Sequence, residues 1–216
     1  FALNKEEQDP NLVTTNRGSK IVDNYFITNH YLDQSVKEFF DYLKKSGLYD
    51  NTAVVLYGDH YGISNTDAKY LAPILGKDES QWSDLDNANL QRVPFMIHVP
   101  GMTDGYIDHT FGGEIDVAPT LEHLLGITTQ RYIQFGQDLL SKQHEQIVAF
   151  RNKDWITPQY ASLSGRYWNV QTNQMITEPT PELQKTLDGI QAAVNEKLDM
   201  SDSLNQKNLL RFYTPE

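Results

Sequence analysis

A short apolar run, Ala53-Val54-Val55-Leu56-Tyr57, constrains the fold of this chain more than any other segment. Because the run is short and unbroken by polar residues, it is typical of a strand buried on both faces of a parallel sheet. Apolar residues at helical spacing precede it from Ile21 to Leu43, and residues 93–99 form a second apolar run. Residues 64–91 are polar, and we expect a surface excursion there. Helices that alternate with buried strands predict an α/β sheet domain with flanking helices.

The pattern changes after Trp155. Two short antiparallel strands joined at Ser164-Gly165 and an amphipathic helix over residues 181–199 are predicted beyond it. The sequence therefore predicts two parts. Residues 1–150 belong to the α/β sheet domain, and residues 151–216 form a small C-terminal α+β subdomain, an antiparallel β-sheet plus a helix.

The composition excludes several classes of function. Eighteen basic residues against twenty-nine acidic ones give a formal net charge of −11. Proteins that bind nucleic-acid phosphates, or an anionic membrane through a basic patch, need clustered Lys and Arg, so we expect no nucleic-acid partner. The absence of cysteine excludes disulfides, zinc–thiolate sites and thiol nucleophiles. No apolar run approaches the roughly 20 residues that span a bilayer, so any membrane anchor is expected upstream.

The segment Gly58-Asp59-His60 is the strongest chemical feature. Two potential metal ligands directly follow a predicted strand, and ligands of open α/β sheets bind at the carboxyl ends of strands. Adjacent strand residues point to opposite faces, so both can grip one ion only if the backbone leaves the extended conformation, which Gly58 and Gly62 permit. A carboxylate and an imidazole suit Mn²⁺, Zn²⁺ or Mg²⁺. The tripeptide alone equally allows Asp59 to cap a turn and His60 to lie on the surface.

The wider pattern resembles the alkaline phosphatase and sulfatase superfamily, and within it the lipoteichoic acid synthases. The superfamily segments, in their usual order, are Val54 to Gly62, Arg92-Val93-Pro94-Phe95 with Pro100-Gly101, Ile115 to Leu121, and Leu124-Leu125-Gly126-Ile127. The segments similar to the synthases are Gly58 to Ser64, His30 to Gln34, Phe150-Arg151-Asn152 and Leu210-Arg211-Phe212-Tyr213. The resemblance covers essentially the whole chain. It implies that residues 1–150 are the C-terminal part of a sulfatase-like catalytic domain.

The resemblance also implies a reaction. In the synthases a Thr attacks the phosphorus of phosphatidylglycerol and releases diacylglycerol, and the glycerophosphate held on the Thr passes to a growing polyglycerolphosphate chain. A divalent ion, typically Mn²⁺, is bound by that Thr, by an N-terminal Glu, and by an Asp-His pair that maps onto Asp59 and His60. Mg²⁺ and Zn²⁺ are alternatives. Tyr61 is expected to line the glycerol pocket and bind substrate. The expected location is the extracellular face of a Gram-positive cell membrane, or the medium after processing.

The half of the family domain that carries the nucleophile is missing from these 216 residues. We therefore expect no catalytic residue in this chain, with the nucleophilic Thr upstream. Two ligands fall short of the four or six of a complete metal site, so the chain alone is expected to be inactive and to bind metal weakly or not at all. A divided sheet exposes an apolar face or an unpaired edge. The chain is accordingly expected to pair with the missing N-terminal half or to self-associate.

The sequence is compatible with two other functions. A sulfatase or phosphodiesterase would hydrolyse instead of transferring, and would differ in its nucleophile. A non-catalytic domain would keep the scaffold and bind envelope polymer or a partner protein.

Other side chains with chemical potential have structural interpretations. His98 is expected to pack in the core, Asp116 to cap the helix that contains Thr120, and the aromatic residues around Trp168 to form core. The remaining candidates, to which we assign loop, turn or packing roles, are Ser64, His30, Asp33, His109 and Glu114.

Overall fold

The computed structural model describes residues 3–14, 19–129 and 131–214. It separates into two compact units, residues 1–106 and residues 107–216. Residues 107–150 therefore lie in the same unit as the C-terminal sheet, whereas the sequence pattern assigns them to the larger domain. The predicted boundary after residue 150 stays a prediction. Among the described residues, no helix is both long enough and apolar enough to cross a membrane.

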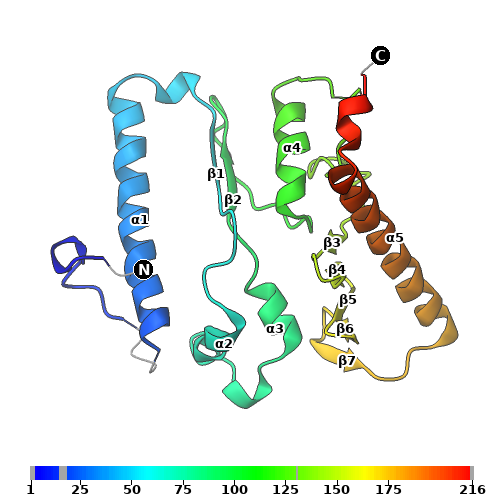
Figure 1. The fold of residues 1–216 in the computed structure, drawn as a ribbon. Coiled ribbons are helices and arrows are strands. Elements are labelled where there is room, and N and C mark those ends of the chain that lie inside the picture. The colour runs from blue at the N-terminus through cyan, green and yellow to red at the C-terminus, as the bar shows by residue number, and fades with distance from the viewer. Residues whose placement is uncertain (1–2, 15–18, 130, 215–216) are drawn as a thin grey trace. The chain divides into compact units, whose positions relative to one another are not determined.

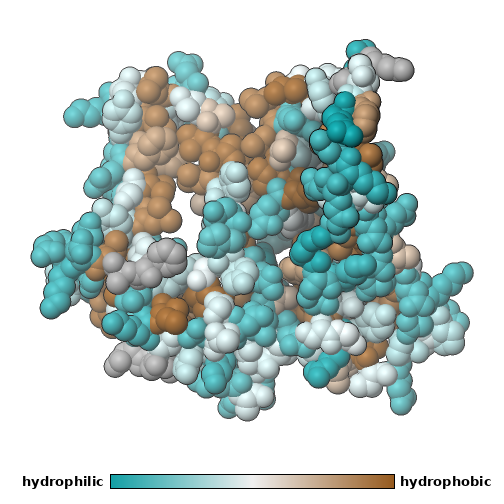
Figure 2. All heavy atoms as spheres, in the orientation of Figure 1, coloured by the Kyte–Doolittle hydropathy of each residue, from teal (hydrophilic) through white to brown (hydrophobic). Residues whose placement is uncertain are grey.

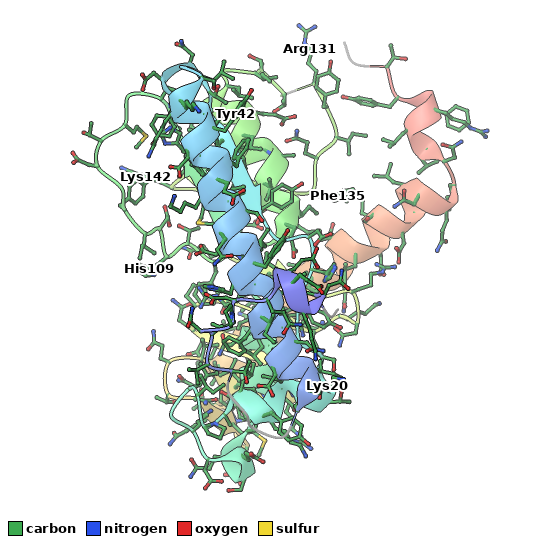
Figure 3. All side chains as sticks on the ribbon, turned by 90° about the vertical axis from the view of Figure 1, so that its left-hand side faces the viewer. Lys20, Tyr42, His109, Arg131, Phe135 and Lys142 are labelled. Carbon is green, nitrogen blue, oxygen red and sulfur yellow. The ribbon has the colours of Figure 1, made fainter. Side chains whose placement is uncertain are left out.

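The first unit contains the long helix α1, Lys20–Lys45 (Figure 1). The Ser19 side chain caps its start by accepting a hydrogen bond from the Val22 amide. Lys44 and Lys45 favour its end because cations stabilise a helix C-terminus, and Gly47 follows with a positive φ of 72°. The predicted helix is confirmed. Figure 3 shows Lys20 and Tyr42 near its opposite ends.

Strand β1, Val54–Tyr57, pairs with β2, Phe95–His98, as a two-stranded sheet. The pairing is antiparallel, with Val54 opposite His98 and Tyr57 opposite Phe95. The strands were expected in a parallel sheet, so this direction is a correction. An apolar run indicates that a strand is buried but does not indicate the direction of the neighbouring strand. Here the long connection over residues 58–94 brings the chain back alongside β1 in the antiparallel direction. Of the β1 residues, only Val54 is buried, so the strand is not covered on both faces within this chain as the apolar run predicted.

The connection between β1 and β2 is more than a surface excursion. It forms short helical elements, namely α2 Asn65–Ala68, η3 Lys69–Leu71, η4 Glu79–Gln81 and α3 Asp84–Asn89. Leu71 joins Val22 of α1 and Ile63 in one buried cluster. Leu85 and Ala88 of α3 are buried as well. The segment therefore contains a small buried core that packs against α1, which its polar composition did not predict. Two further short helices are η1, Lys5–Glu7, and η2, Tyr49–Asn51.

The second unit begins with η5, Glu114–Asp116, and α4, Val117–Leu124, and continues into a five-stranded antiparallel meander. Its strands are β3 Val148–Ala149, β4 Trp155–Ile156, β5 Tyr160–Leu163, β6 Arg166–Asn169 and β7 Gln174–Ile176. The predicted hairpin at Ser164-Gly165 is confirmed. Both turn residues have positive φ, 51° and 73°, as a type I′ turn requires.

Helix α5, Pro181–Gln206, packs its apolar residues on Trp155 of this sheet, and η6, Leu209–Phe212, follows it. Thr180 caps α5, and Pro181 suits its first turn because no intrahelical partner awaits that nitrogen. Trp155 and Leu187 are fully buried, and Trp155 Nε1 donates to Gln191 Oε1 at 3.0 Å. The predicted fold class, a part of a sulfatase-like α/β domain with a small antiparallel sheet and helix, is confirmed.

Candidate metal-binding site

The residues after β1 form an open loop that carries Asp59 and His60. Their side chains are 85% and 70% exposed, yet they converge, with Asp59 Oδ1 3.7 Å from His60 Nε2. Two ligand atoms each about 2.1 Å from one ion are at most about 4.2 Å apart, so this separation suits a shared cation. The backbone has left the extended conformation at this point, as the sequence requires for the pair to act together.

The carbonyl oxygen of Tyr61 orients the His60 ring. His60 Nδ1 lies 2.8 Å from it, and because a carbonyl can only accept, Nδ1 carries the proton. In the neutral imidazole the lone pair then resides on Nε2, the nitrogen that faces Asp59. Metal-binding histidines usually donate their other ring N–H to a backbone carbonyl or a carboxylate in this way. The residues present therefore fit a divalent cation.

The pair is an incomplete ligand set. Within residues 3–14, 19–129 and 131–214, no three or more His, Cys, Asp or Glu side chains gather closely enough to hold a metal ion. The roles of Asp59 and His60 as ligands, and of the half-exposed Tyr61 ring as a pocket wall, stay predictions. High exposure of both ligands is what a site completed by other groups would show.

Close contacts restrict both flanking glycine positions. A Cβ on Gly58 would lie 2.8 Å from Val93 Cβ, and one on Gly62 would lie 2.1 Å from Tyr25 Cε2. Neither glycine has a positive φ. The sequence predicted glycine here for backbone freedom, whereas the structure needs it because neighbouring side chains leave no room for a methyl group.

The alternative candidates in the first unit are engaged elsewhere. His98 stacks on Tyr49 with ring centroids 4.4 Å apart, which matches the expected packing role. The Ser64 hydroxyl bonds to Thr66 and Asp67. His30 Nε2 lies 3.1 Å from Asp9 Oδ2, a loop contact of the kind expected. These contacts leave the Asp59–His60 pair as the candidate site.

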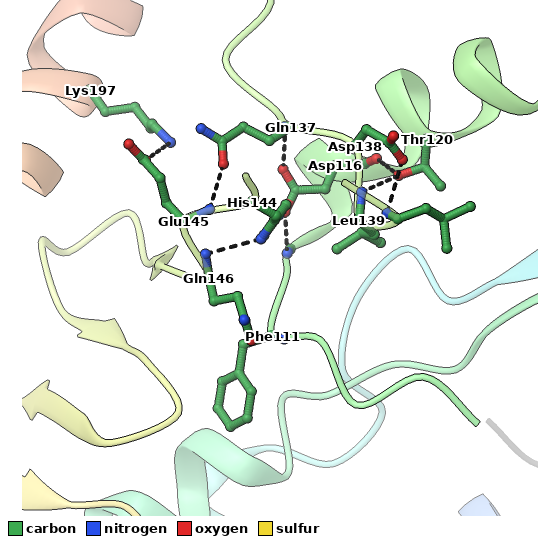
Figure 4. A network of polar contacts seen from close by, with 12 residues as sticks. Phe111, Asp116, Thr120, Gln137, Asp138, Leu139, His144, Glu145, Gln146 and Lys197 are labelled. Carbon is green, nitrogen blue, oxygen red and sulfur yellow. Dashed lines mark hydrogen bonds and ion pairs between the residues drawn. The ribbon is translucent and has the colours of Figure 1, made fainter. Parts of the chain in front are cut away.

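Asp116 anchors a buried network in the second unit (Figure 4). Its Oδ1 accepts from the Gln137 amide at 2.7 Å, and its Oδ2 accepts from the Gly113 amide at 3.0 Å and faces His144 Nε2 at 3.3 Å. The expected cap on α4 is wrong, because the Asp116 side chain makes no cap hydrogen bond to that helix. Its carboxylate instead accepts from the amide of Gly113, the N-cap residue of the preceding η5, as the N3 residue of a capping box does, and from the Gln137 amide of a distant loop. The buried Thr120 hydroxyl donates to the Asp116 carbonyl at 2.6 Å, so it is structural.

No role was predicted for His144 from the sequence. Its Nδ1 accepts from the Gln146 amide at 3.0 Å, so its Nε2–H donates to Asp116, and both side chains are nearly fully buried. The two residues are 28 positions apart, and no local motif joins them. His109 and Glu114 are both exposed, which agrees with the loop roles expected for them.

Comparisons with known proteins show to which family the sequence is related. The sequence profile of the Sulfatase family matches residues 2–127. The chain is 45% identical over 216 residues to lipoteichoic acid synthase 2 of Bacillus subtilis (strain 168), covering 100% of this chain and 32% of that protein. It is 38% identical over 213 residues to lipoteichoic acid synthase of Staphylococcus aureus (strain USA300), covering 99% of this chain and 32% of that protein.

The fold is similar to the crystal structure of the lipoteichoic acid synthase LtaP from Listeria monocytogenes. The TM-score is 0.73 at 31% identity, over 93% of this chain and 50% of that chain. The chain thus spans about a third of the length of the curated relatives it matches. Members of the sulfatase-like family are metal-dependent, which suits a pair of metal ligands at a strand end. On its sequence and its fold together, the chain belongs to the sulfatase family.

Proposed function

We propose that this chain is part of a phosphoglycerol transferase that moves glycerophosphate from phosphatidylglycerol to a growing polyglycerolphosphate chain in lipoteichoic acid synthesis. One observation carries the proposal. Asp59 and His60 converge at the end of β1, in a chain 38–45% identical over nearly all its length to proteins named lipoteichoic acid synthases.

Asp59 Oδ1 and His60 Nε2 are the proposed metal ligands. One carboxylate and one imidazole without a thiolate suit Mn²⁺, with Mg²⁺ and Zn²⁺ as alternatives. When bound, such a cation lowers the pKa of a hydroxyl nucleophile and offsets charge on the phosphoryl oxygens. The Tyr61 carbonyl orients His60, and its half-exposed ring is proposed as the wall against which the glycerol group binds.

The nucleophile is proposed to be a Thr outside these 216 residues. The two hydroxyls nearest in motif context, Ser64 and Thr120, are held by hydrogen bonds to their own neighbours. We accordingly propose that the chain alone is inactive. The complete enzyme is proposed to act at the extracellular face of a Gram-positive cell membrane, where the lipid substrate is available, or after release from it.

Hydrolysis by a sulfatase or phosphodiesterase uses the same scaffold but another nucleophile. The relatives similar over nearly the whole chain are named as synthases, and this favours transfer. No observation favours a non-catalytic binding domain, since the ligand pair is present and open.

The test uses the full-length protein that contains this chain, with Mn²⁺ and phosphatidylglycerol labelled in its glycerol headgroup. We expect label to appear in a polyglycerolphosphate product. Asp59→Ala and His60→Ala should each lower the rate by at least about 100-fold, because each removes a ligand. Mn²⁺ should raise the melting temperature of the wild type but not of Asp59→Ala, since only a protein that binds the ion is stabilised by it.

Asp104→Ala is the matched control, because Asp104 is an exposed carboxylate of the same unit that lies outside the loop. It should leave both rate and metal stabilisation unchanged. Free labelled glycerophosphate in place of polymer would show hydrolysis and overturn the transferase proposal. Equal rates for wild type, Asp59→Ala and His60→Ala would overturn the proposed metal ligands.

A further inference from the structure

The loop that carries Asp59 and His60 is held at its far end by an aromatic ring of α1. The ring of Tyr25 lies so close to Gly62 that a Cβ there would be 2.1 Å from Cε2, 2.4 Å from Cζ and 2.5 Å from Oη. Contacts under 3.0 Å essentially do not occur for real Cβ atoms. The ring and the Gly62 backbone are therefore in direct contact.

The part of α1 that carries Tyr25 is itself fixed by burial. Val22, one helical turn before Tyr25, is fully buried and belongs to one apolar cluster with Ile63, the residue after Gly62. Residues three apart on a helix share a face. One face of α1 thus contacts two consecutive residues of the loop. Val22 packs with Ile63, and Tyr25 contacts Gly62.

The contact between Tyr25 and Gly62 affects the orientation of His60 through the peptide unit that joins Tyr61 to Gly62. The carbonyl of Tyr61 is bonded to the Gly62 nitrogen, and that carbonyl accepts the hydrogen bond from His60 Nδ1. A ring that fixes Gly62 also fixes the Tyr61 carbonyl, because the peptide unit is planar. The carbonyl in turn keeps the proton on Nδ1 and leaves the Nε2 lone pair toward Asp59.

We infer that Tyr25 is a positioning residue for the proposed metal site: its ring fixes Gly62 and so selects the His60 tautomer with Nε2 free to bind a cation. The role of Tyr25 in metal binding rests on the proposed function. The His60 tautomer can be measured in metal-free protein, so the two claims are tested separately.

The first experiment is ¹⁵N NMR of histidine-labelled chain without metal, at alkaline pH, where free imidazole is neutral. Wild type and Tyr25→Phe, which keeps the ring, should show His60 protonated on Nδ1. Tyr25→Leu and Gly62→Ala disturb the contact from opposite sides, and both should shift His60 toward the Nε2-protonated form. Gly105→Ala is the matched control, because nothing lies within 4 Å of its Cβ position and its φ is not positive.

The second experiment measures Mn²⁺ affinity in the full-length protein by electron paramagnetic resonance. Tyr25→Leu should weaken binding by about 10- to 100-fold, the usual loss when a ligand loses its orienting group, and Tyr25→Phe should restore it. Circular dichroism of each variant shows whether it is folded. Because Gly62→Ala leaves Tyr25 itself unchanged, the two variants cannot fail through the same lost side chain.

The inference is overturned if His60 is protonated on Nε2 in the wild type, or if Tyr25→Leu and Gly62→Ala both keep the Nδ1–H form. If the two variants shift the His60 tautomer as expected but the full-length wild type binds no Mn²⁺, the positioning role is supported and the proposed metal site is refuted. The two claims therefore fail separately.

Discussion

Helices α1 and α5 each have 26 residues, but they differ in how much of their apolar surface they bury. Among the large hydrophobic residues of α5, only Met200 is exposed, while Leu187 and Val194 pack on Trp155. Helix α1 buries Val22 and Leu43 but leaves seven large hydrophobic residues exposed, namely Ile21, Tyr25, Phe26, Tyr31, Leu32, Phe39 and Tyr42. In Figure 2, hydrophobic residues gather over α1 and the β1–β2 strands, and the visible face of α5 is hydrophilic.

The difference shows that α5 is packed against its sheet, whereas α1 leaves much of its apolar surface uncovered, as an incomplete layer would. Monomeric soluble proteins rarely expose such contiguous apolar surface. The chain spans 32% of the length of its curated relatives. The candidate site lies in the same unit, at the end of β1. Four substitutions test this contrast.

Trp155→Ala should cause the largest loss of stability. Trp155 is fully buried against α5, and removing a buried Trp typically costs about 3–5 kcal/mol. Urea denaturation followed by circular dichroism measures the change. Tyr106→Ala, at a residue 70% exposed, is the control and should shift stability by less than about 0.5 kcal/mol. Similar losses for the two variants would break the contrast, because the α5 layer would then not be closed.

Asp116→Asn should cost about 1–3 kcal/mol, because the amide group of Asn would face a backbone amide donor that Asp116 now accepts from. Thermal melting of the chain measures the loss. Asp104→Asn, at an exposed residue, serves as the control. Unchanged melting of Asp116→Asn would mean that the buried network in Figure 4 contributes no net stability.

Asp86 should make stability depend on pH in the first unit. Burial opposes its ionisation, but hydrogen bonds from Lys77 and Ser83 outweigh this and hold the pKa of Asp86 below its ordinary value. Lys77 Nζ lies 2.6 and 2.5 Å from the two carboxylate oxygens. The stabilisation is therefore present above the unfolded pKa of about 3.9 and is lost as pH falls through the lower folded pKa.

Urea denaturation of wild type and Asp86→Asn measures this effect. The wild type should be more stable by about 1 kcal/mol near neutral pH, and the difference should shrink below about pH 4. A difference that stays constant into the acid range would contradict an ionised Asp86 as its source.

Tyr57→Ser should have the smallest effect on stability, below about 0.5 kcal/mol, because Tyr57 is 55% exposed. It should nevertheless reduce self-association of the isolated chain, which we expect from the uncovered β1–β2 surface. Sedimentation velocity measures this. A wild-type chain that already sediments as a monomer would contradict the interpretation of α1 and β1–β2 as an incomplete layer.

Local patterns predicted much of this fold. Helical spacing located α1 and α5, and the Ser164-Gly165 pair located the β5–β6 hairpin, because each depends on residues close together in sequence. The direction of β2 was not predictable in this way, since it depends on how the long connection after β1 returns. The buried residues of that connection, such as Leu85, were hidden by their polar neighbours.

The same limit applies to the site residues. Gly58-Asp59-His60 stood out because its chemistry is contiguous in the chain. The link from Asp116 to His144 spans 28 positions and depends on a fold that brings two loops together. The contact between Tyr25 and Gly62 is similarly long-range. The sequence analysis therefore singled out Gly62 for its backbone freedom and could not predict the steric contact with Tyr25.

The most direct test of the account is anomalous diffraction at the manganese edge from crystals of the full-length protein grown with Mn²⁺. The account predicts a manganese peak within coordination distance of both Asp59 and His60 Nε2, with further ligands from residues outside this chain. Side chains of Asp59 and His60 that point away from the catalytic cleft, with no ion beside them, would contradict it.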